Sequence, residues 1–238
     1  MPDFPFLLDV IGRLLLALPM TLALFICCIS LGGVLALGLC WMRVSGIFVL
    51  DRVARGYILM FRGSPLLVQM FLIYYGLGQF PEIRHSAAWP VLREPFACAV
   101  ISLALCTAAY EAEIFRGALM AVNDREVEAA RACGMSGFLL FRRIIFPIAL
   151  RQALPAYTTE MILMVKSTSL ASIITVTEMT GVAQKLTTQT YRTMEIFLCA
   201  AAIYLLVNFI VARLLGFLEY RLGRHTRRVP VLAPVLHE

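Results

Sequence analysis

The sequence predicts an all-α integral membrane protein with five transmembrane helices. Of its 238 residues, 61% are hydrophobic and only 15% are charged, whereas an average soluble domain has about 25% charged residues. The mean hydropathy is +0.83. Several stretches also contain the roughly 20 apolar residues that a spanning helix requires. These observations favour one membrane domain over residues 1–220, followed by a basic tail over 221–238.

The first apolar stretch is expected to remain in the protein as a permanent span over 14–42. Asp3 and Asp9 occupy the place where a signal peptide has basic residues. The apolar run is also longer than the ~7–15 residues of a signal-peptide core. We therefore interpret the amino-terminal segment as the first transmembrane helix.

Four further windows complete the expected set of spans. The second, over 53–80, is interrupted by Arg62, which can snorkel to the cytoplasmic face, and by Pro65, which can kink the helix. The third window, over 96–122, becomes polar toward its end. The fourth, over 154–176, contains two ionisable residues, Glu160 and Lys166. The fifth is expected over 194–217.

The distribution of basic residues predicts the orientation in the membrane. Cytoplasmic loops carry an excess of lysine and arginine. In this chain most basic residues fall on one side of the five spans, and the other side has only Arg13, Arg84, Arg93, Lys185 and Arg192. We therefore expect a periplasmic amino terminus, a cytoplasmic carboxyl terminus with a cytoplasmic tail, and a cytoplasmic loop between the third and fourth spans.

The loop over 123–152 is expected to contain two short helices outside the bilayer. Asn123 or Asp124 can cap the first helix, and Gly134 can end it in a left-handed conformation. A second helix would begin near Ser136 and run into Pro147. The residues alone leave two interpretations open, a docking site for a soluble partner and a solvated amphipathic connector.

Motif order distinguishes between these interpretations. The loop resembles the EAA signature of ABC importer permeases, although Phe146 stands where leucine is usual. Four other segments resemble blocks of the polar amino acid permeases, and they occur in the same order. Over about residues 15–220 the chain is similar to the M-type subunits for histidine, lysine, arginine and ornithine and for the opines octopine and nopaline. The matching residues are Glu128, Ala129, Ala130, Gly134, Ile144 and Pro147, with 62–66, 109–119, 154–157 and 166–170.

This resemblance implies a larger machine in the bacterial inner membrane. A homologous permease subunit would pair with this chain, a cytoplasmic ABC ATPase dimer would dock on the loops, and a periplasmic solute-binding protein would deliver a polar, basic amino acid or an opine. Glu128, Ala129, Ala130 and Gly134 would form the ATPase-coupling element. Closure of the ATPases would then switch the spans between inward-open and outward-open states.

Carboxylates inside the spans are the candidate substrate ligands, because each ionisable group at membrane depth costs about 2.5–3.5 kcal/mol. Glu160 lies about 6 residues into the fourth window, beside the hydroxyl of Thr159, and could bind an ammonium or guanidinium group. A hydrogen bond to a neighbouring helix explains it equally well. Glu111 could meet the same cationic group or face the partner subunit. Glu113 and Arg116, three residues apart, are expected to pair.

Other functions find less support in the sequence. The chain has no phosphate-binding loop and no metal-ligand cluster, so we expect no ATPase activity of its own and no cofactor. The cysteines form no CxxC motif. The net charge of +6 does not indicate nucleic-acid binding, because no basic stripe with interleaved aromatic residues is present. A serine protease centred on Ser136 would need a histidine base, and the three histidines lie outside the spans.

An ion-coupled secondary transporter is the main alternative. It would use Glu111, Glu160 and Lys166 as ion-coupling groups. Such carriers usually have two repeated halves, which five spans cannot supply within one chain. A homodimer could supply them, so this alternative stays open until an ATPase partner is established.

Overall fold

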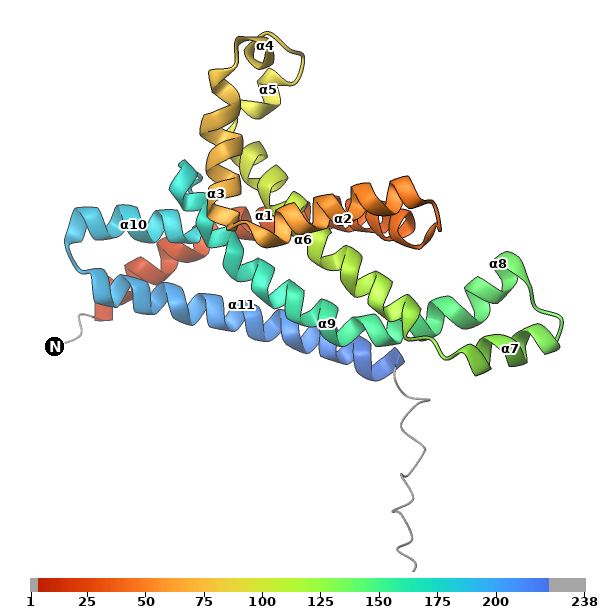
Figure 1. The fold of residues 1–238 in the computed structure, drawn as a ribbon. Helices are drawn as coiled ribbons and strands as arrows, with labels where there is room; N and C mark the ends of the chain where they lie inside the picture. Colours follow the sequence, from red (N-terminus) through yellow and green to blue (C-terminus); the bar gives the residue numbers. More distant parts are fainter. Residues whose placement is uncertain (1–3, 223–238) are drawn as a thin grey trace, which may run out of the picture.

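A computed structural model describes residues 4–222, and all regular elements in that range are helical (Figure 1). The all-α expectation is therefore confirmed for the described residues. Three helices are long and apolar enough to cross a membrane, and two bent helix pairs raise the possible number of spans to five. The three long helices are α1 (Phe4–Val44), α6 (Pro95–Met120) and α11 (Thr193–Leu222). The expected tail lies outside the described residues from 223 onward.

The single span expected over 53–80 is instead broken at Ser64 and Pro65. The chain bends by 102° there. Ser64 is extended, with φ −112° and ψ 147°, because a residue before proline is driven out of the helical region. The side-chain amide of Gln69 donates hydrogen bonds to the carbonyl oxygens of Phe61 and Ser64. The break is flanked by α2 (Phe48–Gly63) and α3 (Leu66–Phe71), and α3 continues as the π-helix η1 (Leu72–Gly76) and the 3₁₀-helix η2 (Leu77–Gln79).

The segment after this bent pair forms a separate cap on the bundle. The second half of the pair, from α3 to η2, leads away from the long helices to this segment, which then returns into α6 (Figure 1). Two single-turn helices, each with a proline in its first turn, make up the cap. They are α4 (Pro81–Arg84) and α5 (Trp89–Leu92).

The second helix of the 123–152 loop, expected to run into Pro147, instead continues past it into the fourth window. Helical structure runs unbroken from Gly137 to Ile174. Proline is tolerated here because it occupies the first turn of α9, directly after a π-helical turn that changes the hydrogen-bond register. The consecutive elements are α8 (Gly137–Leu140), η3 (Phe141–Ile145), α9 (Phe146–Ser167) and the 3₁₀-helix η4 (Thr168–Ile174).

A second bend, of 50°, separates η4 from α10 (Met179–Thr190). Thr175 adopts a left-handed conformation with φ 71° at this point. Glu178 then caps α10 by accepting a hydrogen bond from the backbone N–H of Gly181. The fourth span expected over 154–176 therefore begins earlier, and its continuation changes direction beyond Ile174.

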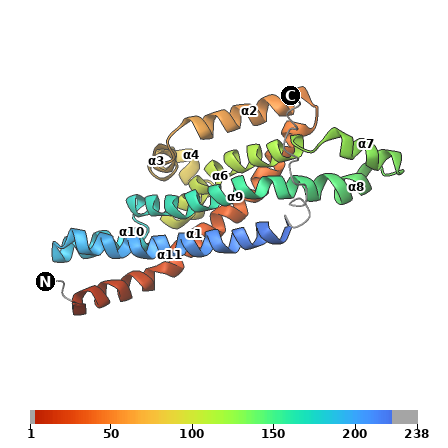
Figure 2. The same ribbon diagram turned by 90° about the horizontal axis from the view of Figure 1, so that it is seen from below.

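The core lies where α1 crosses α6, and α9 packs against α6 as well. Figure 2 shows α1 running diagonally across α6, α9 and α11. Gly32 allows the close crossing, because a Cβ atom there would lie 3.1 Å from the carbonyl oxygen of Ala104 and from the side chain of Thr107. Small buried residues such as Ala108 line the facing side of α6, as is common where membrane helices approach closely.

Candidate functional site

Two glutamates from different helices form a buried acidic pair in the bundle. Glu111 on α6 is fully buried, and Glu160 on α9 is 7% exposed. The two carboxylates are close enough to interact electrostatically. Neither oxygen of Glu111 has a hydrogen-bond partner among the described residues. The structure thus brings together two of the three residues predicted to bind substrate.

The surroundings of the acidic pair come from three helices. Glu111 faces Gly33 of α1, where an added Cβ atom would lie 3.5 Å from its Oε2 atom. Tyr157 on α9 lies within electrostatic range of Glu111 and stacks on Phe115 of α6, with ring centroids 6.1 Å apart. A carboxylate without partners is costly in a low-dielectric interior. This arrangement is therefore suited to accept a cation.

A positive group approaches the acidic pair from α2. The guanidinium of Arg62 interacts electrostatically with Glu160 and lies over the ring of Tyr110, 4.9 Å from its centroid. Tyr110 directly precedes Glu111 in the sequence. The site therefore places an arginine and two carboxylates on adjoining helices. That combination can bind both charges of a zwitterion.

Thr159, the third predicted ligand, does not join the acidic pair. Its side chain is exposed, and its hydroxyl donates to the carbonyl oxygen of Pro155 at 3.1 Å. Lys166 is also exposed and forms no ion pair with any residue in the described range. Both residues belong to an exposed row at helical spacing on α9, formed by Gln152, Pro155, Ala156, Thr159, Leu163 and Lys166.

The predicted coupling residues lie on a helix that projects from the bundle. This helix is α7 (Asp124–Ala132), and it leaves the bundle next to α8 (Figure 1). Asn123 caps it by accepting a hydrogen bond from the backbone N–H of Arg125 at 3.0 Å. Glu128 and Ala129 are exposed, whereas Ala130 is buried. The outward face of α7 therefore combines a carboxylate with a small side chain.

Gly134 ends this helix as the sequence predicts. Its φ is +80°, a conformation that favours glycine. The backbone N–H of Gly134 donates to the carbonyl of Arg131, and that of Met135 donates to the carbonyl of Ala130. These two bonds form a Schellman motif, which satisfies the last carbonyls of the helix. Gly134 thus fixes the shape of the projection.

An ion-pair network joins α1, α2 and α6, and sequence reasoning found only part of it. The expected pair between Glu113 and Arg116 is present, with an Nη2–Oε2 distance of 2.7 Å. Arg43, at the end of α1, also binds Glu113 at 3.1 Å and bridges it to Asp51 of α2. Asp51 in turn accepts from Arg55. The role of Arg43 cannot be predicted from local spacing, because its partners are 8 and 70 positions away in the sequence.

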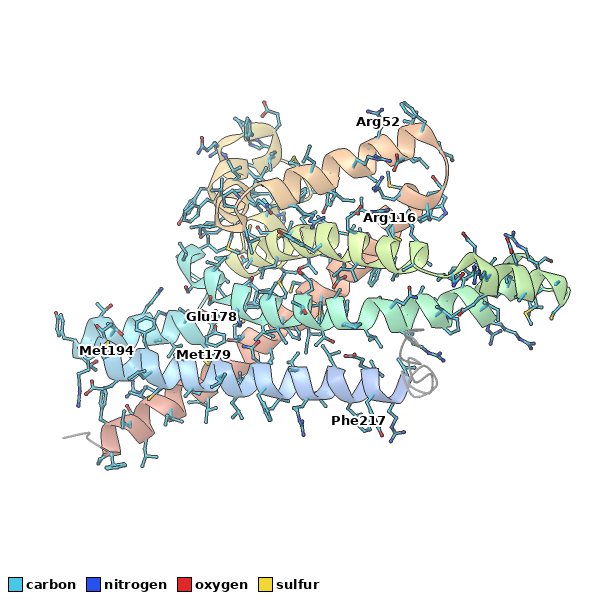
Figure 3. The ribbon with its side chains drawn as sticks, turned by 60° about the horizontal axis from the view of Figure 1, so that its bottom comes forward. Arg52, Arg116, Glu178, Met179, Met194 and Phe217 are labelled. Atoms are coloured by element: carbon cyan, nitrogen blue, oxygen red, sulfur yellow. The ribbon has the colours of Figure 1, made fainter. Side chains whose placement is uncertain are left out.

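Sequence reasoning also missed a fully buried carboxylate at the start of α10. Figure 3 places Glu178 where α10 meets the neighbouring helices. Its carboxylate accepts from the hydroxyls of Tyr204 on α11 and Thr21 on α1, at 2.8 and 3.5 Å. The capping bond to Gly181 completes the set. Because all of these donors belong to the described chain, Glu178 is a structural residue that connects α1, α10 and α11.

Several known proteins are similar to this chain over most of its length. The octopine transport system permease protein OccM of Rhizobium radiobacter is 56% identical over 94% of this chain and 92% of its own length. The nopaline transport system permease protein NocM of Agrobacterium fabrum is 47% identical, with 98% and 97% covered. A solved amino acid ABC transporter with histidines superposes with a TM-score of 0.81 at 33% identity, covering 93% of this chain and 99% of that one.

These matches confirm the resemblance to the polar amino acid and opine permeases that the motif order indicated. A family model also covers most of the chain, from residue 29 to residue 224. The chain belongs to the family described as the binding-protein-dependent transport system inner membrane component.

Proposed function

We propose that this chain is the membrane-spanning permease subunit of an ABC importer that carries polar, basic amino acids or opines across the bacterial inner membrane. The main support for this proposal is the 56% identity to an octopine permease over nearly the full length of both chains. The histidine-containing amino acid transporter of similar fold supports the wider substrate class. All of these solutes combine an α-carboxylate with one or more cationic groups.

The coupling element of this proposal is the projecting helix α7. Glu128 and Ala129 present an exposed polar and small surface to a docking partner, while Ala130 and Gly134 fix the helix against the next segment. The basic residues nearby favour a cytoplasmic location for this loop. An ABC ATPase dimer would bind there and supply the energy of ATP hydrolysis, so the permease itself would not be an enzyme.

The solute site of this proposal is the acidic pair of Glu160 and Glu111. Their burial and the absence of any described partner for Glu111 favour a cationic ligand over a structural role. Arg62 is the positively charged group of the same region, and it is suited to bind the carboxylate of the solute. Thr159 would contribute from the exposed row of α9 when a second subunit covers it.

A second permease subunit would complete the translocation path. The exposed row on α9 contains Thr159 and Lys166, which are unsuited to lipid contact. Pairing of two related subunits along this row would shield both groups. We propose a heterodimer, with a periplasmic binding protein delivering the solute from the side of the amino terminus.

Reconstitution provides the direct test. The permease, its pairing partner, the ATPase and the binding protein would be placed in vesicles, and uptake of labelled arginine and octopine would be measured with and without ATP. We expect uptake that requires ATP and the binding protein and is unaffected by collapsing the proton gradient. Uptake that follows the proton gradient without ATP would favour the ion-coupled secondary transporter.

A further inference from the structure

An arginine-lined pocket lies between the end of α1, the helix α2 and the middle of α6, apart from the acidic pair. Its volume is about 520 Å³. Arg43, Arg55 and Arg62 contribute side chains from two of these helices, and Tyr110 and Glu113 close it from α6. We call this cavity the arginine pocket.

The arginine pocket is positively charged even after its internal ion pairs are counted. Asp51 is shared by Arg43 and Arg55, and Glu113 is shared by Arg43 and Arg116. These two carboxylates therefore neutralise two of the three arginines in the network, and Arg62 adds a further positive charge. The pocket and its rim carry a net charge of about +2 on this reckoning, which favours an anion.

Arg62 is available for such an anion. No carboxylate among residues 4–222 lies within ion-pair distance of its guanidinium, which instead rests over the ring of Tyr110 at 4.9 Å. A Cβ atom added at the adjacent Gly63 would meet nothing within 4 Å. Arginine has a planar fork of donors that matches phosphate oxygens. The free guanidinium and the open space beside it thus fit a phosphate group.

The outer surface of α2 indicates where the phosphate comes from. Its exposed side chains include large apolar residues next to the pocket, and Leu59 belongs to both surfaces. An amphipathic helix with arginines beside an apolar face is typical of the boundary between headgroups and acyl chains. A free anion would use the arginines and leave the apolar face unused. The exposed apolar residues of α2 are Phe48, Val49, Val53, Leu59 and Met60.

We propose that the arginine pocket binds the phosphate headgroup of an anionic membrane lipid, with the lipid's acyl chains along α2. Basic pockets between membrane helices are suited to such headgroups. The bound phosphate would satisfy Arg62 and strengthen the contact among α1, α2 and α6. The pocket lining includes neither Glu111 nor Glu160, but Arg62 also faces the solute site, so the test measures lipid binding and not uptake.

Lipid binding to the assembled permease complex tests the proposal. The complex would be purified into detergent, stripped of lipid, and titrated with phosphatidylglycerol or phosphatidylcholine while native mass spectrometry counts the bound lipids. We expect the wild type to bind phosphatidylglycerol more tightly. Arg62→Gln should weaken that binding about fivefold, which corresponds to about 1 kcal/mol for one arginine at a membrane surface.

A matched control comes from the same helix. Arg52 is exposed at the outer edge of α2, stacks on Phe48 and does not line the pocket (Figure 3). Arg52→Gln removes the same charge and should leave the affinity for phosphatidylglycerol within about twofold of wild type. Equal losses in Arg52→Gln and Arg62→Gln would mean that only general surface charge attracts the lipid, and the proposal would be overturned.

Two further arms make the result decisive. Inorganic phosphate should not displace phosphatidylglycerol at equal concentration, and displacement would identify a free anion as the ligand and overturn the lipid assignment. If Arg62→Gln fails to elute as a folded complex, Arg55→Gln makes the same comparison, because the Arg55 side chain is 62% exposed and Asp51 keeps its bond to Arg43. A wild type that binds both lipids equally would also overturn the proposal.

Discussion

The hydroxyl of Tyr204 donates a 2.8 Å hydrogen bond to the carboxylate of Glu178, and this bond joins α11 to the start of α10 inside the bundle. Thr21 of α1 donates to the same carboxylate. The bend between η4 and α10 therefore ends on a residue that three helices hold in place. Stability at this point depends on side chains that are far apart in the sequence.

Tyr204→Phe should destabilise the protein, because the buried Glu178 would lose one of its donors. A buried charged group left short of a partner costs about 1–3 kcal/mol. Thermal unfolding of the purified permease in detergent measures the effect. The exposed Tyr75 provides the control, and Tyr75→Phe should leave the melting temperature unchanged. A Tyr204→Phe melting curve that coincides with that of the control would contradict the structural role of Glu178.

Gly32→Val should also lower stability, here through crowding between α1 and α6. The new Cβ atom would begin 3.1 Å from the backbone of Ala104 and from the side chain of Thr107. Overpacking of this kind typically costs about 1–3 kcal/mol. Gly38→Val on the same helix is the matched control, because no atom lies within 4 Å of a Cβ there. The two variants should differ in yield of folded protein and in melting temperature.

Glu128→Lys should weaken association with the ATPase without affecting membrane insertion. The substitution reverses an exposed charge on the outward face of α7 and leaves Ala130 and Gly134 in place. Co-purification of a tagged ATPase measures the effect, for which we expect at least a tenfold loss. Glu82→Lys makes the same charge change on the distant α4 and should retain the ATPase. Full retention by Glu128→Lys would count against the coupling role.

Glu160→Gln should impair uptake of cationic solutes more than docking of the ATPase. The change keeps the shape of the side chain and removes the charge that would bind an ammonium or guanidinium group. Hydrogen bonds to charged groups contribute about 1.5–3 kcal/mol, so uptake of arginine should fall about tenfold or more. ATPase co-purification serves as the internal control. Unchanged uptake kinetics would exclude Glu160 from the solute site.

Glu111→Met should raise thermal stability while lowering uptake of cationic solutes. The carboxylate is fully buried and has no hydrogen-bond partner within the described chain. Replacing such a group with an apolar side chain of similar size removes its desolvation penalty. Functional residues often carry a stability cost of this kind. A lower melting temperature for Glu111→Met would show that another part of the assembled complex pairs with this carboxylate.

Local sequence signals predicted the parts of the fold that depend on neighbouring residues. The length of an apolar run is one such signal, and α6 occupies Pro95–Met120 where the window was 96–122. Helix caps are another, as Asn123 and Gly134 show. The pairing of Glu113 with Arg116 follows from helical spacing alone.

Features that depend on tertiary contacts could not be predicted from local sequence signals. Pro65 and Pro147 look alike in the sequence, yet the helix breaks at the first and continues through the second. The difference lies in Gln69, which satisfies the backbone at the break, and in the π-helical turn before Pro147. The bridge from Arg43 to Asp51 and Glu113 could not be predicted, because neither carboxylate stands at a helical spacing from Arg43.

The unbroken helix that begins at Gly137 connects the turn after α7 to Glu160 of the acidic pair. Glu160 lies 23 positions along it, or about 35 Å at the helical rise per residue. A rod of this kind turns a small tilt at its outer end into a sideways displacement at its inner end. Movement of α7, the proposed docking surface, would thereby shift Glu160 relative to Glu111, which is anchored on a different helix.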